Sequence, residues 1–504
     1  MQYENPVIKG FYPDPSICKH EDTYYLVCST FNYFPGVPLF ESKDLVNWDL
    51  IGYTLSRESQ LELAGTGNAG GIYAPTIRCH NGRFYMVTTH VSHSHFYVWT
   101  DDIYGEWSEP IWVDQEGIDP SLYFEDDKVY FMSNGNDTEG NAAVLQCEID
   151  VATGKKITET QFIWSGSGGR YLEAPHLYKI NDTYYIIASE GGTEYGHMVI
   201  YAKGETPYGP FEQYPSNPVL TNRDLGGYQL QGAGHADLIE DNDGNWWMVH
   251  LAFRQLSRYE MHHILGREVC LVPVTFDEDG WFSVDGGITT KMIVETDKIS
   301  DAVIQKPLPI YTFDGPSWSK EWTFLRNPKM ENYEIEDGML KLKATDVKLT
   351  DSVNSPSFIA LRQRELHGSI EVKVKVTEQE AGLTFYMNDH HHYDFAVVKS
   401  PSCTKIIKRR CVGDIEFIQE QQVIASDEVV LQVVFDNQAY RLQAIVDGET
   451  VDFGSCHARY LSKETADGFT GVVMGLYAQG MHDSKDFSAE FSSFKCSYPP
   501  VVHE

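Results

Sequence analysis

One aspartate held between two prolines, Asp14 in the segment Phe11-Tyr-Pro-Asp-Pro-Ser, is the first candidate for chemistry in this sequence. Proline fixes its own φ and restricts the residue before it, so the Asp14 carboxylate has little backbone freedom. A carboxylate held in this way is either a turn cap or an aimed reactive group. For one Asp-Pro pair alone, the turn cap is the better interpretation. Repetition of this segment along the chain favours the second interpretation, a reactive carboxylate.

Related segments begin at Ala74, Asp119, Ala174 and His235. Each runs through a short apolar strand and a tight polar turn into an aromatic-rich strand, which is the pattern of a β-hairpin. Repeats of roughly 40–60 residues with several strands each are typical of a β-propeller. The sequence therefore predicts an all-β protein whose residues 1–305 form a five-bladed β-propeller.

Equivalent positions of the repeats are expected to meet at the axis of such a propeller, where the first strand of each blade lies. Asp14, Asp119 and His235 are equivalent positions, and Glu173 immediately precedes the fourth repeat start. Converging buried carboxylates repel one another and raise one another's pKa values, so packing alone does not explain them. Alanine at two of the five starts leaves room for a ligand.

Two carboxyl groups on either side of a neutral polar substrate are the equipment of glycoside hydrolysis, and they stand roughly 6.5–9.5 Å apart in the inverting form. A third carboxylate would keep the pKa of the acid high. Phe31 and Tyr73, beside the repeat starts, could pack against a sugar ring. A catalytic metal is the alternative, but the HxH, HExxH and DxDxDG spacings do not occur among these residues.

The propeller pattern ends before a proline-containing connector at residues 306–312. Residues 313–504 contain many alternating segments, such as Ile370-Glu-Val-Lys-Val-Lys-Val, which predict a β-sandwich domain. Sandwiches of this kind often bind sugars. The run His390-His-His is open to two interpretations, a metal site on one strand face and a polar hairpin turn, and the turn is favoured.

The composition limits the possible partners and compartments. A formal net charge of −34 argues against nucleic acid and against an anionic membrane as partners. A secretory leader and a run of 18 apolar residues are both lacking in the sequence. The nine cysteines form no CxxC pair, which favours free thiols in a reducing cytoplasm. A cytoplasmic protein is therefore expected, and homo-oligomerisation stays open.

Five ordered segments closely resemble glycoside hydrolase family 43, in particular its β-xylosidase and α-L-arabinofuranosidase members. They are Asn5-Pro-Val-Ile-Lys-Gly-Phe-Tyr-Pro-Asp-Pro-Ser, Ser29-Thr-Phe-Asn-Tyr-Phe-Pro-Gly-Val-Pro, Gly71-Ile-Tyr-Ala-Pro-Thr-Ile-Arg, Gly117-Ile-Asp-Pro-Ser-Leu and Glu173-Ala-Pro-His-Leu. The resemblance is dense over the propeller and looser over the C-terminal region. It implies a five-bladed propeller and an inverting mechanism, with Asp14 as general base, Glu173 as general acid, and Asp119 orienting the acid and modulating its pKa.

The same resemblance implies roles for further residues. His235 matches an axial histidine beside a water-ligated calcium or similar ion, and a core histidine is the structural alternative. Arg267 matches an arginine that binds sugar hydroxyls, and a surface charge is its alternative. Phe469 is the candidate aromatic with which the sandwich narrows the mouth of the site, and a hydrophobic turn is equally compatible. Tyr73 stands where close xylosidase relatives have Trp, which leaves the sugar preference open.

The sequence thus predicts an inverting exo-glycosidase that releases a terminal pentose, β-1,4-xylose and/or α-L-arabinofuranose, from short xylo- or arabino-oligosaccharides. Its chemistry requires no cofactor, with an axial Ca²⁺ near His235 as an optional ion. One alternative is an α-L-arabinofuranosidase with little xylosidase activity. The alternative from another class is a non-catalytic carbohydrate-binding propeller with a lectin-like sandwich.

Overall fold

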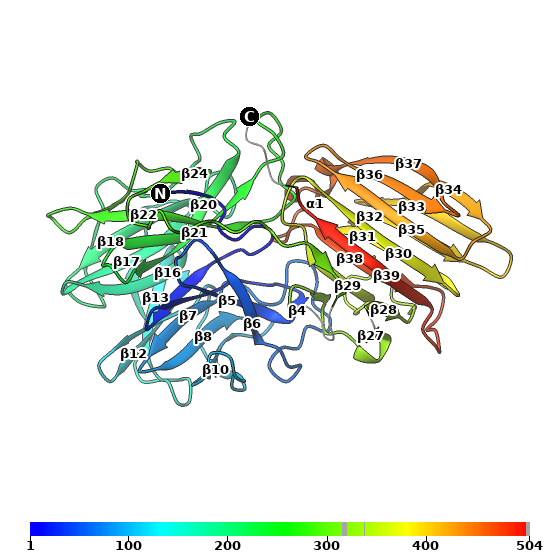
Figure 1. Cartoon of the computed structure of the whole chain (residues 1–504). Helices are drawn as coiled ribbons and strands as arrows, with labels where there is room; N and C mark the ends of the chain where they lie inside the picture. Colours follow the sequence, from blue (N-terminus) through cyan, green and yellow to red (C-terminus); the bar gives the residue numbers. More distant parts are fainter. Residues whose placement is uncertain (315–319, 337, 500–504) are drawn as a thin grey trace.

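The computed structural model describes residues 1–314, 320–336 and 338–499 and consists almost entirely of β-strands. Two lobes lie side by side: an N-terminal lobe coloured blue to green, and a C-terminal lobe coloured yellow to red (Figure 1). The helical segments of the described residues are short: η1 (Met330–Asn332), η2 (Ala458–Leu461) and α1 (Lys463–Ala466). None of the described helices is long and apolar enough to span a bilayer.

The N-terminal lobe contains five antiparallel sheets that follow one another along the chain. In chain order their strands are β2 (Ser16–His20), β3 (Thr23–Val27), β5 (Gly36–Ser42) and β6 (Asp49–Leu55); β7 (Thr76–His80), β8 (Arg83–Thr89), β9 (His95–Thr100) and β10 (Ile111–Val113); β11 (Ser121–Glu125), β12 (Lys128–Asn136), β13 (Ala142–Asp150), β14 (Lys155–Lys156) and β15 (Gln161–Trp164); β16 (Glu173–Ile180), β17 (Thr183–Glu190), β18 (Met198–Gly204) and β19 (Phe211–Gln213); β20 (Leu230–Glu240), β21 (Trp246–Arg254), β22 (Glu268–Phe276) and β23 (Phe282–Val284).

The five predicted hairpins are confirmed, and they share one register. The buried apolar residue three positions after each repeat start faces a buried apolar residue of the second strand. The pairs are Ile17 with Leu26, Ile77 with Met86, Leu122 with Phe131, Leu177 with Ile186, and Leu238 with Met248. The repeat starts therefore occupy structurally equivalent positions in the five hairpins.

The first strands of the five sheets form a closed ring. Strand β2 contacts β7, β7 contacts β11, β11 contacts β16, β16 contacts β20, and β20 contacts β2. The start of the chain is tied to the fifth sheet: β1 (Gln2–Glu4) pairs with β24 (Ile293–Glu295), and the Asn5 side chain exchanges two 2.9 Å hydrogen bonds with the backbone of Leu271. The five repeat starts therefore face a common axis.

The C-terminal lobe contains an eight-stranded and a six-stranded sheet, as the predicted β-sandwich requires. The larger sheet contains β25 (Tyr311–Thr312), β27 (Tyr333–Glu336), β28 (Met339–Leu342), β30 (Gly368–Val376), β35 (Glu428–Phe435), β36 (Ala439–Val446), β37 (Glu449–His457) and β39 (Ala489–Ser497). The smaller one contains β29 (Ser357–Arg362), β31 (Gln379–Asn388), β32 (His391–Lys399), β33 (Thr404–Val412), β34 (Ile415–Ile424) and β38 (Val473–Gln479).

Alternation along the strands explains the sandwich. Every second residue of β30 is buried from Gly368 to Val376, and the apolar ones join a core that both sheets share. Strand β25 lies within the residues predicted as a connector and pairs with β39. His390 lies in the hairpin turn between β31 and β32, as predicted, whereas His391 and His392 belong to β32. The buried His392 pairs with Asp394 at 2.8 Å.

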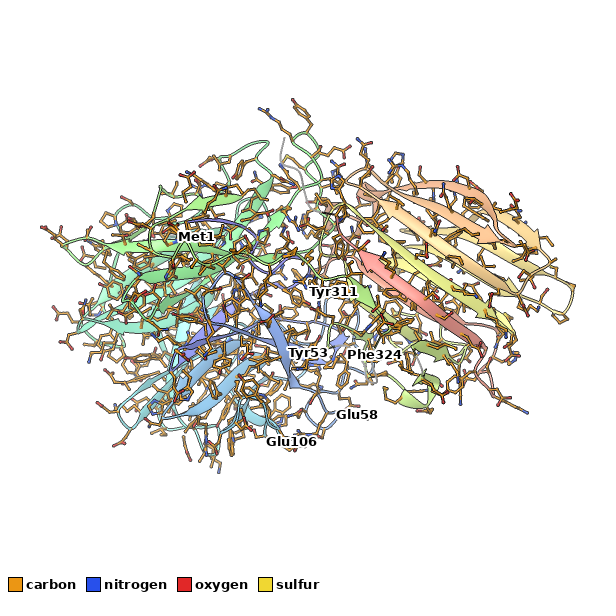
Figure 2. The ribbon with its side chains drawn as sticks, viewed as in Figure 1. Met1, Tyr53, Glu58, Glu106, Tyr311 and Phe324 are labelled. Atoms are coloured by element: carbon orange, nitrogen blue, oxygen red, sulfur yellow. The ribbon has the colours of Figure 1, made fainter. Side chains whose placement is uncertain are left out.

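The two lobes share a hydrophobic core. Phe11, Phe31 and Tyr33 of the N-terminal lobe pack in one cluster with C-terminal residues that include Phe358 and Tyr386. A two-stranded sheet also crosses the boundary, because β4 (Tyr33–Phe34) pairs with β26 (Phe324–Leu325). Phe324 and Tyr53 lie at this boundary in Figure 2, and the Tyr53 hydroxyl donates to the Lys320 carbonyl at 2.9 Å.

A buried ion-pair network joins the lobes at a second place. The Arg254 guanidinium donates to Glu268 of its own lobe at 2.8 Å and to Glu365 of the C-terminal lobe at 2.5 Å. Lys9 contacts the other oxygen of Glu365 at 2.6 Å. Burial opposes ionisation of Glu365, but Arg254 and Lys9 lower its pKa to about 2. Glu365 therefore stabilises the folded chain as an anion.

We predict that Glu365→Gln lowers the free energy of unfolding at pH 7 by about 3 kcal/mol, the value of a carboxyl pKa shift of this size. Because the folded-state pKa is depressed, the stabilisation is present above the unfolded-state pKa and is lost as the pH falls towards 2. Urea denaturation at pH 7, 5 and 3 measures this. The exposed Glu58→Gln is the control (Figure 2). Equal stability of Glu365→Gln and wild type at pH 7 would contradict the prediction.

Candidate active site

The residues predicted for the site line one cavity, which has a volume of about 70 Å³. Its lining residues are Asp14, Phe31, Tyr73, Ala74, Ile118, Asp119, Glu173, Thr193, His235, Arg267 and Phe469. A larger cavity of about 520 Å³ lies beside the connector, away from these carboxylates. Three carboxyl groups from distant parts of the chain therefore meet in one small space.

A left-handed backbone marks four of the five repeat starts. Asp14, Asp119, Ala174 and His235 have φ values of 56°, 55°, 55° and 49°. Non-glycine residues occupy this region rarely, at a cost of about 1–3 kcal/mol each, and persist there only where the surrounding structure fixes them. The same backbone kink therefore occurs at equivalent positions, just before β2 and β11 and inside β16 and β20, where the strand register shifts.

Asp14 is held as an anion. Its Oδ1 accepts a 2.5 Å ion-paired hydrogen bond from Arg267 Nη1, and its Oδ2 accepts a hydrogen bond from the Ser29 hydroxyl. Burial alone would raise the pKa of Asp14, but Arg267, His235 and Ser29 together hold the pKa below its ordinary value. An ionised carboxylate at this position can accept a proton from water.

Asp119 has the opposite electrostatic environment. Burial and the neighbouring carboxylates of Glu173 and Asp14 raise the pKa of Asp119 well above its ordinary value. Its Oδ2 accepts a 3.1 Å hydrogen bond from the backbone N–H of Ala174, the residue after Glu173. Asp119 is therefore positioned against the segment that carries Glu173, as an orienting residue must be.

Glu173 is the more accessible acid, because 18% of its side chain is exposed. Its Oε1 lies 3.2 Å from Nε2 of the buried His197, without the alignment of a hydrogen bond. His197 Nδ1 lies 3.3 Å from the Gly232 carbonyl, to which it can only donate, so in the neutral ring Nε2 carries the lone pair. A protonated Glu173 thus has a possible acceptor beside it.

Three aromatic rings form one wall of the cavity. The centroids of Phe31 and Tyr73 are 5.2 Å apart, and the Phe469 ring lies 5.6 Å from Phe31 and 5.8 Å from Tyr73. The Phe469 carbonyl accepts a 3.2 Å hydrogen bond from Arg267 Nη2, whose guanidinium also faces the Phe31 ring. Since Phe469 comes from the C-terminal lobe, that lobe completes the cavity.

A close backbone approach explains how Phe469 reaches the cavity. A Cβ at Gly471 would lie 2.4 Å from the Leu265 carbonyl oxygen, so only glycine fits there. The adjacent Val472 N–H donates to the Ile264 carbonyl at 2.8 Å. The loop that carries Phe469 is thereby fixed against the segment that leads to Arg267.

His235 lies beside the Asp14 carboxylate, and burial lowers the pKa of His235. Its Nδ1 is 3.6 Å from Asp14 Oδ1, and its backbone N–H donates to Ser189 Oγ at 2.7 Å. No three His, Cys, Asp or Glu side chains of the described residues come together as a metal site. Asp14 is paired with Arg267, so an ion beside His235 would take most of its ligands from water, and the axial Ca²⁺ stays a prediction.

Several residues of the site were missed by sequence reasoning. Ser29, Thr193 and His197 contact Asp14, Arg267 and Glu173 respectively. Ser29 opens one of the family-like segments, which was a usable signal. Thr193 and His197 follow the second strand of the fourth sheet, in a stretch without a repeat or motif.

Two further polar residues lie on strands near the site. Asn134 belongs to β12. Its side chain accepts from the Ile118 N–H at 2.7 Å and donates to the Leu172 carbonyl at 3.2 Å, and so braces the residues that precede Asp119 and Glu173. Asp237 is fully buried within β20.

Comparison with known families identifies this architecture. The family described as Glycosyl hydrolases family 43 matches residues 3–282, and the Beta xylosidase C-terminal Concanavalin A-like domain matches residues 311–497. The chain belongs to glycoside hydrolase family 43. It is therefore a glycoside hydrolase, as the sequence analysis predicted.

Relatives of this family 43 chain extend over its whole length. It is 37% identical to the non-reducing end alpha-L-arabinofuranosidase BoGH43B of Bacteroides ovatus, over 98% of this chain and 95% of the relative. It is 30% identical to a beta-xylosidase of Bacillus subtilis, over 97% and 98% of the two chains. Among solved structures, a xylan beta-1,4-xylosidase from Bacillus halodurans has a TM-score of 0.91 at 30% identity, with 98% of this chain and 99% of that chain covered.

The Asp14–Arg267 pair generates a prediction about pH. In wild type, Asp14 should stay ionised below its ordinary pKa of 3.8, so kcat/KM for an aryl glycoside should stay level on the acid side down to about pH 4. In Arg267→Met, the guanidinium no longer opposes the effect of burial, so the pKa of Asp14 should rise. The acid limb of the kcat/KM profile should then move to higher pH. Profiles of both proteins, with the exposed Arg83→Met as control, measure the shift. If the acid limb of Arg267→Met lies at the same pH as in wild type, Arg267 does not control the pKa of Asp14.

Proposed function

We propose that this glycoside hydrolase is an inverting exo-glycosidase that removes a terminal pentose, β-1,4-xylose and/or α-L-arabinofuranose, from short xylo- or arabino-oligosaccharides. We further propose that its five sheets are the blades of a five-bladed β-propeller, which the closed ring of first strands supports. Residues 1–305 would be the catalytic domain, residues 306–312 the linker and residues 313–504 the sandwich domain.

One observation carries the mechanism: neighbouring carboxyl groups in a single cavity have environments that push their pKa values apart. Asp14 is kept ionised by Arg267, whereas the pKa of Asp119 is raised beside Glu173. The lowered pKa of Asp14 supports its role as the base, and Glu173, the more exposed carboxyl group, is proposed as the acid. Asp14 takes a proton from the attacking water, Glu173 gives its proton to the leaving oxygen, and Asp119 holds the segment of Glu173 in place. This chemistry uses side chains alone and requires no cofactor.

The shape of the cavity supports removal of single sugar residues. Its volume of about 70 Å³ is small, and Phe469 of the second lobe closes one side. Phe31, Tyr73 and Phe469 provide apolar surface for a sugar ring, and Arg267 provides donors for its hydroxyl groups. An open groove for a long polysaccharide would not need this aromatic wall from the other lobe.

Sugar preference is proposed from the relatives. The names of similar proteins include both activities, as in a xylosidase/arabinosidase of Butyrivibrio fibrisolvens at 34% identity. The relative with 37% identity is named an arabinofuranosidase, which favours the alternative of an α-L-arabinofuranosidase with little xylosidase activity. A cytoplasmic location is also proposed, supported by nine free cysteines. Homo-oligomerisation stays a prediction.

The direct test compares wild type with Asp14→Asn on 4-nitrophenyl β-D-xylopyranoside and 4-nitrophenyl α-L-arabinofuranoside. We expect hydrolysis of at least one substrate, and a loss of about 10³-fold or more in Asp14→Asn, because the water then lacks its base. The ratio of the two wild-type rates gives the sugar preference. Tight sugar binding without turnover by folded wild type would favour a non-catalytic propeller, and a fully active Asp14→Asn would remove the base assignment.

A second prediction concerns the leaving group. Glu173→Ala should slow substrates with poor leaving groups, such as xylobiose, about 10²–10⁴-fold, the usual range for loss of acid catalysis. Aryl glycosides with activated leaving groups should be much less affected because they depart without a proton. Equal losses on both substrate types would contradict the acid role. Circular dichroism provides the folding control.

A further inference from the structure

A second layer of polar side chains lies on the same first strands, directly beyond the catalytic residues. Ser16 follows Asp14 by two residues, and Asp237 follows His235 by two. Since alternate residues of a strand share a face, both are expected to point toward the ring axis. Their contact confirms this, because the Ser16 hydroxyl donates to Asp237 Oδ2 at 2.6 Å. The layer is buried, with Ser16 at 1% and Asp237 at 0% exposure.

Asp237 is the centre of this layer. Its Oδ2 also accepts from the Ile17 N–H at 3.0 Å and from Arg78 Nη1 at 2.8 Å. Its Oδ1 accepts from Arg78 Nη2 at 3.1 Å, from the Tyr178 hydroxyl, and from the Leu238 N–H at 3.0 Å. These donors come from β2, β7, β16 and β20, so one carboxylate contacts four of the five first strands.

Arg78 completes the layer from the second sheet. Besides its two hydrogen bonds to Asp237, it donates to the Ile77 carbonyl at 2.8 Å and lies 3.0 Å from His176 Nδ1. A guanidinium only donates, so His176 Nδ1 must accept and the ring must be neutral. Burial, followed by the positive charge of Arg78, keeps it so and lowers the pKa of His176 to about 3. Arg78 is thus fixed on both sides.

The strands that this pair joins carry the reacting groups. Asp14 lies two residues before the start of β2, Glu173 is the first residue of β16, and His235 lies in β20. A bidentate arginine–carboxylate pair is more rigid than a single hydrogen bond, and burial strengthens it further. Shifts of about 1 Å in a catalytic constellation can reduce rates about 10²-fold. Clamping these strands therefore bears directly on the catalytic geometry.

We propose that Arg78 and Asp237 are positioning residues that act together as an internal clamp, holding the strands of Asp14, Glu173 and His235 at catalytic spacing. The inference rests on the glycosidase proposed above. Arg78 also supplies the positive charge of the axis from the chain itself. Among the described residues of this layer, Asp237 carries the negative charge, and the guanidinium of Arg78 balances that charge. The clamp therefore requires no axial calcium ion.

The test measures kcat, KM and melting temperature for wild type, Arg78→Met, Asp237→Leu and the double variant. Arg78→Met should lower kcat about 10–100-fold with KM changed less than about 3-fold, because spacing rather than binding is disturbed. Replacing both partners by apolar residues removes the unpaired buried charge but leaves the Ser16 and Tyr178 hydroxyls without this acceptor, so the double variant should regain part of the melting temperature and none of the kcat. If the double variant regains both, or if folded Arg78→Met keeps wild-type kcat, the pair is merely structural.

Arg409→Met is the matched control, because Arg409 forms a buried bidentate pair with Glu380 at 2.8 and 2.7 Å in the C-terminal lobe. It should lower the melting temperature without lowering the kcat of the folded protein. If Arg78→Met fails to fold, Arg78→Lys, which keeps the charge but loses the bidentate geometry, should show the same loss of kcat; wild-type kcat in that variant would overturn the proposal.

An independent measurement uses wild type alone. Dialysis against EDTA, followed by return of Ca²⁺, should leave kcat and melting temperature unchanged. A loss of either that Ca²⁺ restores would overturn the statement that the chain supplies its own axial charge. Failure of the proposed function is distinguishable from these outcomes, because wild type would then hydrolyse neither aryl glycoside.

Discussion

The ion pair between Asp14 and Arg267 is the interaction on which the site depends. A fully buried carboxylate would otherwise take up a proton, and a protonated Asp14 could not activate water. The pair joins residues 253 positions apart at a distance of 2.5 Å. Arg267 is itself held by the Phe469 carbonyl of the other lobe. Closure of the ring and docking of the lobes are therefore both needed to give Asp14 its lowered pKa.

Docking of the lobes follows from apolar packing rather than from a flexible tether. Phe11, Phe31 and Tyr33 share a core with residues of the sandwich, and Arg254 forms a buried ion pair with Glu365 across the boundary. Phe31 belongs both to this core and to the cavity wall. The same packing that stabilises the two lobes thus shapes the wall of the cavity, so the sandwich lobe contributes to the candidate site.

Charge is arranged along the axis in two layers. Around the cavity, the three carboxyl groups lie near one arginine, Arg267, and the pKa of Asp14 is lowered while that of Asp119 is raised. One layer further on, Asp237 and Arg78 neutralise each other and accept or donate in every direction. The layer of three carboxyl groups therefore rests on a layer in which the buried carboxylate and guanidinium are paired with each other.

The sequence by itself determined the repeat, the hairpins, the sandwich and the three carboxylates, because these depend on local periodicity and on positions that recur in register. The matching pairs from Ile17–Leu26 to Leu238–Met248 show how far that reasoning extends. Only the tertiary structure decided the partners of those residues. Thr193, His197 and Asn134 lie in stretches without a repeat signal, and nothing local in the sequence pairs Asp237 with Arg78, which is 159 residues away. Such contacts arise when the ring closes and the lobes dock, and a buried charge acquires its role only from the groups that closure brings around it.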